Sequence, residues 1–287
     1  MCDDFIHPGL VEDHRLSRRS FGLMTAAAAG APVVAMAQSN VVEKDVTVKT
    51  LDGTCDAALF HPAGQGTHAA VLIWPDIMGL RPAFRDMGRR LARQGYVVLV
   101  PNPFYRSARA PVIGESFDFN NPEQRQRLFG YRAAMTDAGV DNDALAYLAF
   151  LDAQPQTNKS KKAGVQGYCM GGSLSFRTAA ALPGRIAAVG SFHGGNGLVT
   201  KEPNSPHLLI PKTNASYLVC QAQNDDMAQT QMKEDLKAAF AAANRPATVE
   251  VYAANHGWCV KGGAVYDEAE AERAWAALTK LYQTQLA

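Results

Sequence analysis

The sequence predicts an α/β fold: a doubly wound, mostly parallel β-sheet flanked by helices, with an antiparallel hairpin at its N-terminal edge. Short apolar runs alternate along the chain with stretches of helical periodicity. The runs lack the alternation of a half-exposed strand, which indicates strands buried on both faces. Strands that alternate with helices are typical of a parallel sheet. The turn Asp52-Gly53 separates two further strand-like runs, as in a hairpin.

The individual elements follow from these patterns in chain order. The hairpin is expected from residues 44–50 and 55–60. Further strands are expected at 69–74, 96–100, 163–166, 186–191, 216–221 and 248–252. Helices are expected at 82–94, 122–152, 170–182, 228–243 and 264–284. Ligands of open parallel sheets bind beyond the carboxyl ends of the strands, so functional residues are expected directly after each strand.

Composition excludes several classes of protein. The 287 residues include 28 Lys and Arg against 27 Asp and Glu, and 47% of them are hydrophobic. These values are typical of a globular, enzyme-sized chain and exclude disorder. A net charge of +1 without a long basic run gives no footprint for nucleic acid. No phosphate-binding loop or dinucleotide fingerprint follows a strand, so we expect no cofactor and no nucleic acid partner.

Residues 1–37 have the features of an export signal. Arg18-Arg19 precedes an apolar run at 25–36 that is too short to span a membrane, and a small-x-small pattern ends at Ala37. The segment resembles a twin-arginine signal. That resemblance implies cleavage after Ala37, a periplasmic or secreted location and no stable membrane anchor afterwards. The alternative is an amphipathic helix with a chance arginine pair.

The remaining chain, residues 38–287, is expected to form one α/β domain. It contains no low-complexity linker, internal repeat or break in composition. Its length of about 250 residues suits a single domain of this class, and we expect a monomer.

A cysteine in a glycine-rich turn is the first candidate for chemistry. Gly167, Cys169 and Gly171 form a Gly-x-nucleophile-x-Gly pattern between an expected strand and an expected helix. A nucleophile on such a sharp turn requires residues without side chains two positions away on either side. The positive end of the following helix also lowers a thiol pKa. The pattern therefore predicts Cys169 as a nucleophile; the alternative is a turn around a buried, inert cysteine.

An acid and a histidine follow later strands, in the chain order that a nucleophile elbow requires. Asp225 and His256 each come after one of the last two expected strands. His256 can take the thiol proton, and Asp225 can hold the imidazole tautomer. We therefore predict the triad Cys169, Asp225 and His256. Asp226 is the alternative acid, and a turn or helix-cap role is the alternative for either aspartate.

Five stretches spread over nearly the whole of the expected domain carry a family resemblance. They are residues 74–80, 89–96, 101–106, 167–172 and 256–258. Together they resemble the dienelactone hydrolase family, the carboxymethylenebutenolidases, which are α/β-hydrolases that open an unsaturated lactone with a cysteine nucleophile. The resemblance implies a hydrolase that opens a lactone or cleaves a small ester through an acyl-enzyme.

The resemblance also implies roles for groups beside the nucleophile. In the family, an acid after the first central strand, usually glutamate, takes part in activating the thiol, and this position is Asp76. Aspartate is one methylene shorter, so its contact with Cys169 requires a small backbone shift or a water. The N–H groups of Ile77 and Met170 would form the oxyanion hole. The alternative for Asp76 is a turn or helix-cap acid.

The same resemblance implies a substrate pocket. Members that act on dienelactone hold its carboxylate with arginines, and Arg106 takes the place of one. The second arginine would fall near Val260, and this departure disfavours dienelactone as the substrate. An ordinary surface arginine is the alternative for Arg106. Further substrate-binding residues are expected at Phe104, Tyr105, His193 and Trp258, with a place in the core as the alternative for the aromatic ones.

The sequence also leaves rival interpretations open. A hydrolase for other small esters or lactones would use identical chemistry. A catalytically silent periplasmic binding protein is the alternative from another class, and the ordered triad argues against it. A zinc site of Cys220, His256 and Cys259 lacks a second close ligand pair, so we expect no metal. Cys55, Cys220 and Cys259 could instead include one disulfide of unassigned pairing.

Overall fold

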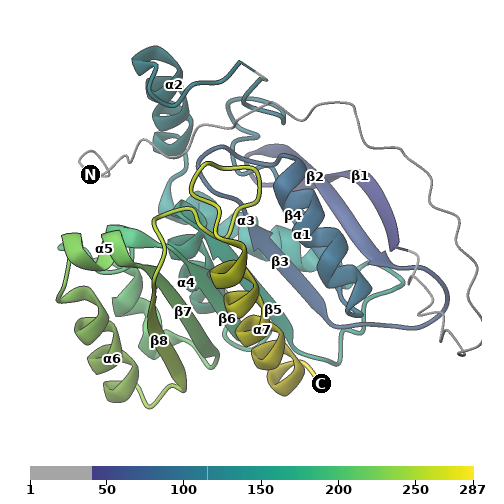
Figure 1. Cartoon of the computed structure of the whole chain (residues 1–287). Helices are drawn as coiled ribbons and strands as arrows, with labels where there is room; N and C mark the ends of the chain where they lie inside the picture. Colours follow the sequence, from purple (N-terminus) through teal and green to yellow (C-terminus); the bar gives the residue numbers. More distant parts are fainter. Residues whose placement is uncertain (1–40, 115) are drawn as a thin grey trace, which may run out of the picture.

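Eight strands form one sheet through the centre of the molecule (Figure 1). The computed structural model describes residues 41–114 and 116–287. The strands are β1 (Val41–Thr50), β2 (Gly53–Pro62), β3 (Ala70–Trp74), β4 (Val97–Pro101), β5 (Ala163–Tyr168), β6 (Ile186–Phe192), β7 (Ser216–Ala222) and β8 (Ala247–Tyr252). Their order in the sheet is β1-β2-β4-β3-β5-β6-β7-β8. The pairs β1–β2 and β2–β4 are antiparallel, and all other neighbours are parallel. The predicted fold class is confirmed, including its N-terminal hairpin.

Helices cover both faces of this sheet (Figure 1). The α-helices of the described residues are α1 (Pro82–Arg93), α2 (Pro122–Ala133), α3 (Asp137–Asp152), α4 (Met170–Ala181), α5 (Gln223–Ala228), α6 (Met232–Ala242) and α7 (Glu268–Gln285). Side chains of α1 and α7 share one apolar layer with the sheet, and those of α3, α4 and α6 share the other. Two 3₁₀ turns, at Gly195–Gly197 and Pro206–Lys212, follow β6.

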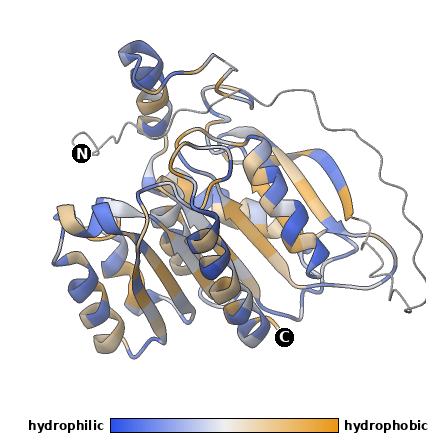
Figure 2. Cartoon of the chain, viewed as in Figure 1, coloured by the Kyte–Doolittle hydropathy of each residue, from blue (hydrophilic) through white to orange (hydrophobic). Residues whose placement is uncertain are grey.

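The apolar pattern of the central strands explains this two-layered arrangement. All five residues of β3 are buried, and the strand is hydrophobic along its length (Figure 2). Successive side chains of a strand point to opposite faces, so a wholly apolar strand requires cover on both. Phe84 of α1 provides cover on one face, and Phe176 of α4 provides it on the other. The parallel strands consequently end at one common edge, where the ligand site of such a sheet lies.

The expected helix at 122–152 is two helices in the structure, so that prediction was wrong. The helix α2 ends at Ala133, and α3 begins at Asp137. Thr136 adopts an extended backbone, and its hydroxyl accepts a hydrogen bond from the Gly139 N–H at 3.1 Å. A threonine in this position satisfies a free N–H of the first turn and begins a new helix.

The segment after β7 also differs from expectation. The short helix α5 begins directly after the strand, and α6 begins at Met232 rather than near residue 228. The first turn of α5 therefore carries Asp225, which the sequence placed in a loop.

The predicted export signal, residues 1–37, lies outside the described residues. Among the residues that the structure describes, no helix combines the length and apolar character needed to cross a bilayer.

Candidate active site

Cys169 occupies a sharp turn between β5 and α4. Its backbone is left-handed, with φ 54° and ψ −120°, which is strained for a residue with a side chain. A Cβ atom on Gly167 would lie 1.8 Å from the carbonyl oxygen of Gly171. A Cβ on Gly171 would lie 2.4 Å from the carbonyl oxygen of Trp74. The two glycines therefore allow the tight turn that the sequence pattern predicts.

The turn places Cys169 at the positive end of a helix. The helix α4 begins at Met170 and has no acidic residue in its first turn. Its unpaired N–H groups and its dipole favour negative charge at this end. Cys169 is partly exposed, so a reactant can reach its sulfur. The position suits a thiolate nucleophile.

Asp225 and His256 meet at the same edge of the sheet. His256 Nδ1 and Asp225 Oδ2 are 2.7 Å apart, and the His256 backbone N–H donates to Asn224 Oδ1 at 2.8 Å. The Asp225 side chain is 9% exposed. Asp226, the alternative acid, instead accepts a hydrogen bond from Lys233 at 2.8 Å. The short helix α5 thus presents Asp225 to the imidazole and directs Asp226 away from it.

The electrostatics of His256 connect it to Cys169. Burial alone would lower the pKa of His256. The charge and hydrogen bond of Cys169, together with those of Asp225, raise this pKa well above its ordinary value. The arrangement favours the charged imidazolium form of His256 beside Cys169 and Asp225. Such a group can deliver a proton to a leaving oxygen.

His193 lies beside both of these side chains, but not as the substrate group that the sequence suggested. It is 1% exposed, and its Nδ1 accepts a hydrogen bond from the Cys169 N–H at 3.1 Å. Its ring meets the His256 ring edge to face, with centroids 4.9 Å apart, and the Trp258 ring at 5.3 Å. A side chain buried in this way contacts the triad rather than a ligand.

Asp76 is held by an arginine that the sequence analysis did not single out. Arg81 donates to both Asp76 oxygens, at 2.6 and 2.8 Å, and both side chains are 6% exposed. The Met78 N–H donates to the same carboxylate at 2.9 Å. Asp76 therefore makes its hydrogen bonds within the loop after β3. This is the turn role that the sequence analysis gave as the alternative. The signal was present in the sequence as a cation five residues after the acid.

The two amides expected to form the oxyanion hole belong to segments in close contact. The close approach of Gly171 to Trp74 packs the first turn of α4 against the end of β3. Met170 is the first residue of α4, where a helix has no internal acceptor for the N–H. Among the hydrogen bonds of the described turns and side chains, none uses the Ile77 N–H. Both amides are thus available to an oxyanion.

The expected carboxylate-binding residue, Arg106, is already paired. Its guanidinium donates to both oxygens of Asp143, at 2.7 and 2.9 Å, and to Asp52 at 2.6 Å. The Tyr105 hydroxyl donates to Asp143 at 2.7 Å. Arg106 therefore joins α3 to the β1–β2 turn. In this structure its guanidinium N–H groups bond to carboxylates of the fold and are not directed at a ligand site.

The other expected pocket aromatics lie in the core. Phe104 is 1% exposed, and Trp258 is fully buried against Tyr252, with ring centroids 5.2 Å apart. Large apolar rings gain more free energy from complete burial than from lining an open pocket.

The other three cysteines of the described residues are free thiols. Cys55 and Cys220 are fully buried, and Cys259 is partly buried. Burial raises the pKa of Cys259 well above its ordinary value, which disfavours the reactive thiolate form. Within residues 41–114 and 116–287, no group of three His, Cys, Asp or Glu side chains is arranged to hold a metal ion.

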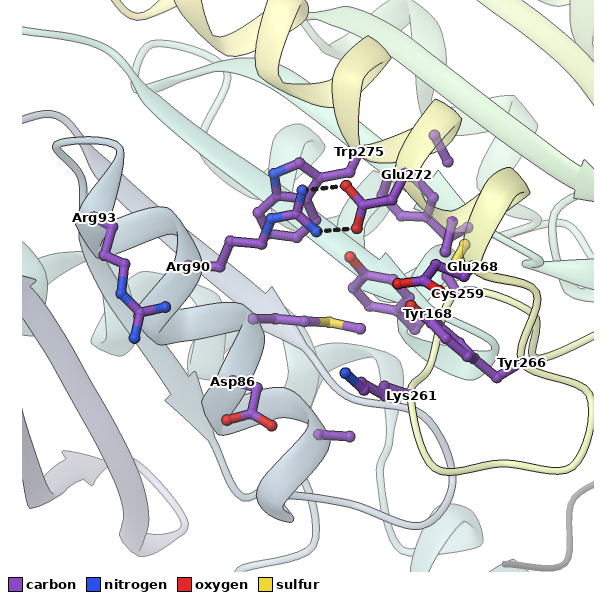
Figure 3. Close-up of a pocket in the computed structure, with 15 residues that line it drawn as sticks. Asp86, Arg90, Arg93, Tyr168, Cys259, Lys261, Tyr266, Glu268, Glu272 and Trp275 are labelled. Atoms are coloured by element: carbon purple, nitrogen blue, oxygen red, sulfur yellow. Dashed lines mark hydrogen bonds and ion pairs between the residues drawn. The ribbon is translucent and has the colours of Figure 1, made fainter. Parts of the chain in front are cut away.

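A cavity of about 280 Å³ lies between α1 and α7, apart from the triad (Figure 3). Tyr168 and Phe192 line it, and their rings stack with centroids 4.9 Å apart. These residues directly precede Cys169 and His193 in the chain. At its rim, Arg90 donates to both carboxylate oxygens of Glu272. The cavity therefore lies behind the turn at Cys169, and its lining does not include Cys169, Asp225 or His256.

Known proteins resemble this chain over nearly the whole described domain. The family model "Dienelactone hydrolase family" matches residues 55–286. A carboxymethylenebutenolidase of Rhodococcus opacus is 25% identical over 201 residues, which is 70% of this chain and 74% of that protein.

Solved structures agree in fold. A dienelactone hydrolase from Anabaena variabilis superposes with a TM-score of 0.61 at 18% identity, covering 86% of this chain and 99% of that one. A dienelactone hydrolase-like promiscuous phosphotriesterase from metagenomic libraries superposes with a TM-score of 0.67 at 21% identity, with the same coverage.

Proposed function

Because the chain belongs to the dienelactone hydrolase family, we propose that it opens a lactone or cleaves a small ester through a cysteine nucleophile and an acyl-enzyme. The observation that carries the proposal is the chain of contacts through His256. Its Nδ1 lies 2.7 Å from Asp225 Oδ2, and the influence of Cys169 together with that of Asp225 raises the pKa of the imidazole. A catalytically silent binding protein would not require this arrangement.

The acylation step uses each of these groups in turn. His256 takes the proton of the Cys169 thiol, Sγ attacks the carbonyl carbon, and the C=O π electrons move onto the oxygen. The N–H groups of Ile77 and Met170 stabilise this oxyanion. When the tetrahedral intermediate collapses, the C–O bond breaks and the departing oxygen takes a proton from His256. The acyl group remains on Cys169 as a thioester.

Deacylation returns the site to its starting state. His256 takes a proton from water, and the resulting hydroxide attacks the thioester carbon. The thiolate then leaves, and the acid is released. Asp225 holds the imidazole in one orientation throughout and stabilises its charged form.

We infer that the substrate is an uncharged ester or lactone rather than dienelactone. The donors of Arg106 are occupied by Asp52 and Asp143. The second position at which the family resemblance implies an arginine carries Val260, which is 4% exposed. Neither position supplies a free cation for the substrate carboxylate.

A panel of three substrates tests this function. The chain from Gln38 onward is assayed with p-nitrophenyl acetate, an unsubstituted lactone and dienelactone, before and after treatment with iodoacetamide. We expect turnover of the first two compounds and its loss on alkylation. Activity that survives complete alkylation of Cys169 would contradict the thiol mechanism, and preferred turnover of dienelactone would contradict the proposed substrate class.

Arg106→Met is expected to destabilise the fold without changing recognition of a neutral ester. The Asp143 side chain is 1% exposed, so its charge would be left without its ion-pair partner. We expect the free energy of unfolding to fall by about 3 kcal/mol and KM for p-nitrophenyl acetate to stay within about twofold. Urea unfolding and steady-state kinetics measure the two effects.

Lys237→Met is the matched control for that variant. Lys237 pairs with Glu234 at 3.0 Å on the surface, where both side chains are about half exposed. This variant should lower the free energy of unfolding by less than about 1 kcal/mol. If Arg106→Met leaves the free energy of unfolding unchanged and raises KM only for dienelactone, Arg106 binds the substrate instead, and the structural role proposed for it is wrong.

We also propose that residues 1–37 direct export through a twin-arginine pathway, with cleavage after Ala37. The paired arginines, the short apolar run and the small-x-small pattern support this proposal. Cell fractionation and N-terminal sequencing test it: replacement of Arg18 and Arg19 by lysine should retain the uncut chain in the cytoplasm.

A further inference from the structure

His193 contacts the nucleophile through the backbone rather than the sulfur. The Cys169 N–H is shared between two acceptors in consecutive residues, the Phe192 carbonyl oxygen at 3.0 Å and His193 Nδ1 at 3.1 Å. His193 itself has a left-handed backbone, with φ 37°. The last residue of β6 and the residue that follows it thus both accept from the amide of Cys169.

The protonation state of His193 follows from this contact. An Nδ1 that accepts a hydrogen bond carries no proton, so the neutral ring has its hydrogen on Nε2. His193 Nε2 is buried and has no hydrogen-bond partner within the described part of the chain. Burial, followed by the nearby charges of His256 and Arg81, lowers the pKa of His193 well below its ordinary value. Both the accepted hydrogen bond and the lowered pKa favour the neutral ring.

The same ring also borders the general acid–base. Its centroid is 4.9 Å from that of His256, and the two rings meet edge to face. Trp258 packs against another part of the ring at 5.3 Å. One buried side chain consequently touches the backbone of the nucleophile and the ring of its proton acceptor, although it belongs to a different strand from either.

We propose that His193 is a positioning residue, which fixes the Cys169 backbone by accepting its N–H and thereby holds the sulfur toward His256. The inference rests on the proposed function of Cys169 as nucleophile. A turn with φ 54° persists only where the surroundings determine it, and a second acceptor on the Cys169 amide supplies such a restraint. At 1% exposure, the His193 ring offers almost no surface to a substrate.

Two variants distinguish the effect of the hydrogen-bond acceptor from the effect of the aromatic ring. His193→Phe keeps a planar ring against His256 but removes the acceptor. His193→Asn has an amide oxygen at the branch position that Nδ1 occupies, and asparagine tolerates a left-handed backbone. Because small misplacements of a nucleophile cost up to about a hundredfold, we expect kcat of His193→Phe to fall at least about tenfold. KM for p-nitrophenyl acetate should change by less than about twofold, since uniform binding is untouched.

Rescue by the conservative variant is the decisive readout. His193→Asn should retain a clearly higher kcat than His193→Phe, with both variants folded by circular dichroism. Wild-type kcat in His193→Phe, or equal impairment of the two variants, would overturn the proposal.

The rate of Cys169 alkylation by iodoacetamide, followed by mass spectrometry, reports on the nucleophile without any substrate. It should fall in His193→Phe and recover in His193→Asn. If the wild-type protein neither hydrolyses esters nor alkylates at Cys169, the proposed function itself fails. A reactive wild type with an equally reactive His193→Phe variant refutes only the role of His193.

Discussion

Replacing Cys169 with alanine is expected to abolish ester hydrolysis, with kcat/KM falling by about four orders of magnitude or more. In the proposed mechanism the Cys169 sulfur forms the acyl-enzyme, and alanine has no group that could replace it. Cys169→Ser should also lose most of the activity, because a hydroxyl requires a stronger base than a thiol to become a nucleophile. Steady-state assays with p-nitrophenyl acetate measure both losses, and circular dichroism confirms that the variants are folded.

Cys259→Ala provides the matched control. Cys259 is a partly buried thiol three residues after His256, and burial keeps it protonated. This variant should retain wild-type activity and remain sensitive to iodoacetamide. Substantial turnover by Cys169→Ala, or loss of sensitivity to iodoacetamide in Cys259→Ala, would place the nucleophile elsewhere.

Gly167→Ala is expected to have the largest effect on the fold. The added Cβ would lie 1.8 Å from the Gly171 oxygen and 2.2 Å from its carbonyl carbon, and both are backbone atoms that cannot move aside independently. The first turn of α4 must shift away from β5. We expect a loss of about 4 kcal/mol or more in the free energy of unfolding, together with loss of activity. Urea unfolding followed by circular dichroism measures the change.

Gly130→Ala is the control for the effect of a methyl group alone. Gly130 lies within α2, and no heavy atom outside its local backbone would lie within 4 Å of an added Cβ. Alanine favours a helix over glycine by about 0.5–1 kcal/mol, so this variant should be slightly stabilised. A Gly167→Ala protein as stable and active as wild type would show that the turn does not need its glycine.

The features predicted correctly from the sequence depend on residues that lie close together in the chain. Each buried strand is a short apolar run, and the catalytic turn requires small residues at fixed spacing. The spacing of Gly167 and Gly171 therefore indicates, by itself, the tight turn around Cys169. The acid and histidine follow strands whose parallel order brings them to one edge, so the meeting of Asp225 with His256 is also foreseeable.

The features that the sequence did not reveal depend on contacts across the fold. Arg106 lies 54 and 37 residues from Asp52 and Asp143, and no local pattern links the three. Trp258 stacks on Tyr252 at the end of the preceding strand, β8, and its burial also depends on packing against His193, which follows β6. A residue placed after a strand is therefore near the site, but its side chain can turn into the core or toward another charge.

The helix boundary at Thr136 illustrates a local signal that can be missed. Threonine before an acidic first turn is a cap pattern, yet the helical periodicity continues on both sides of it.

Mass spectrometry of the protein mixed rapidly with p-nitrophenyl acetate tests the central claim most directly. In the proposed mechanism deacylation requires His256 to activate water, whereas p-nitrophenolate can leave without a proton from His256. His256→Ala should therefore slow deacylation more than acylation and allow the intermediate to accumulate. We predict an added acetyl group, located on the peptide that contains Cys169, and none in Cys169→Ala. An acetyl group on another residue, or turnover without any acyl adduct under conditions that trap it, would contradict a thioester intermediate on Cys169.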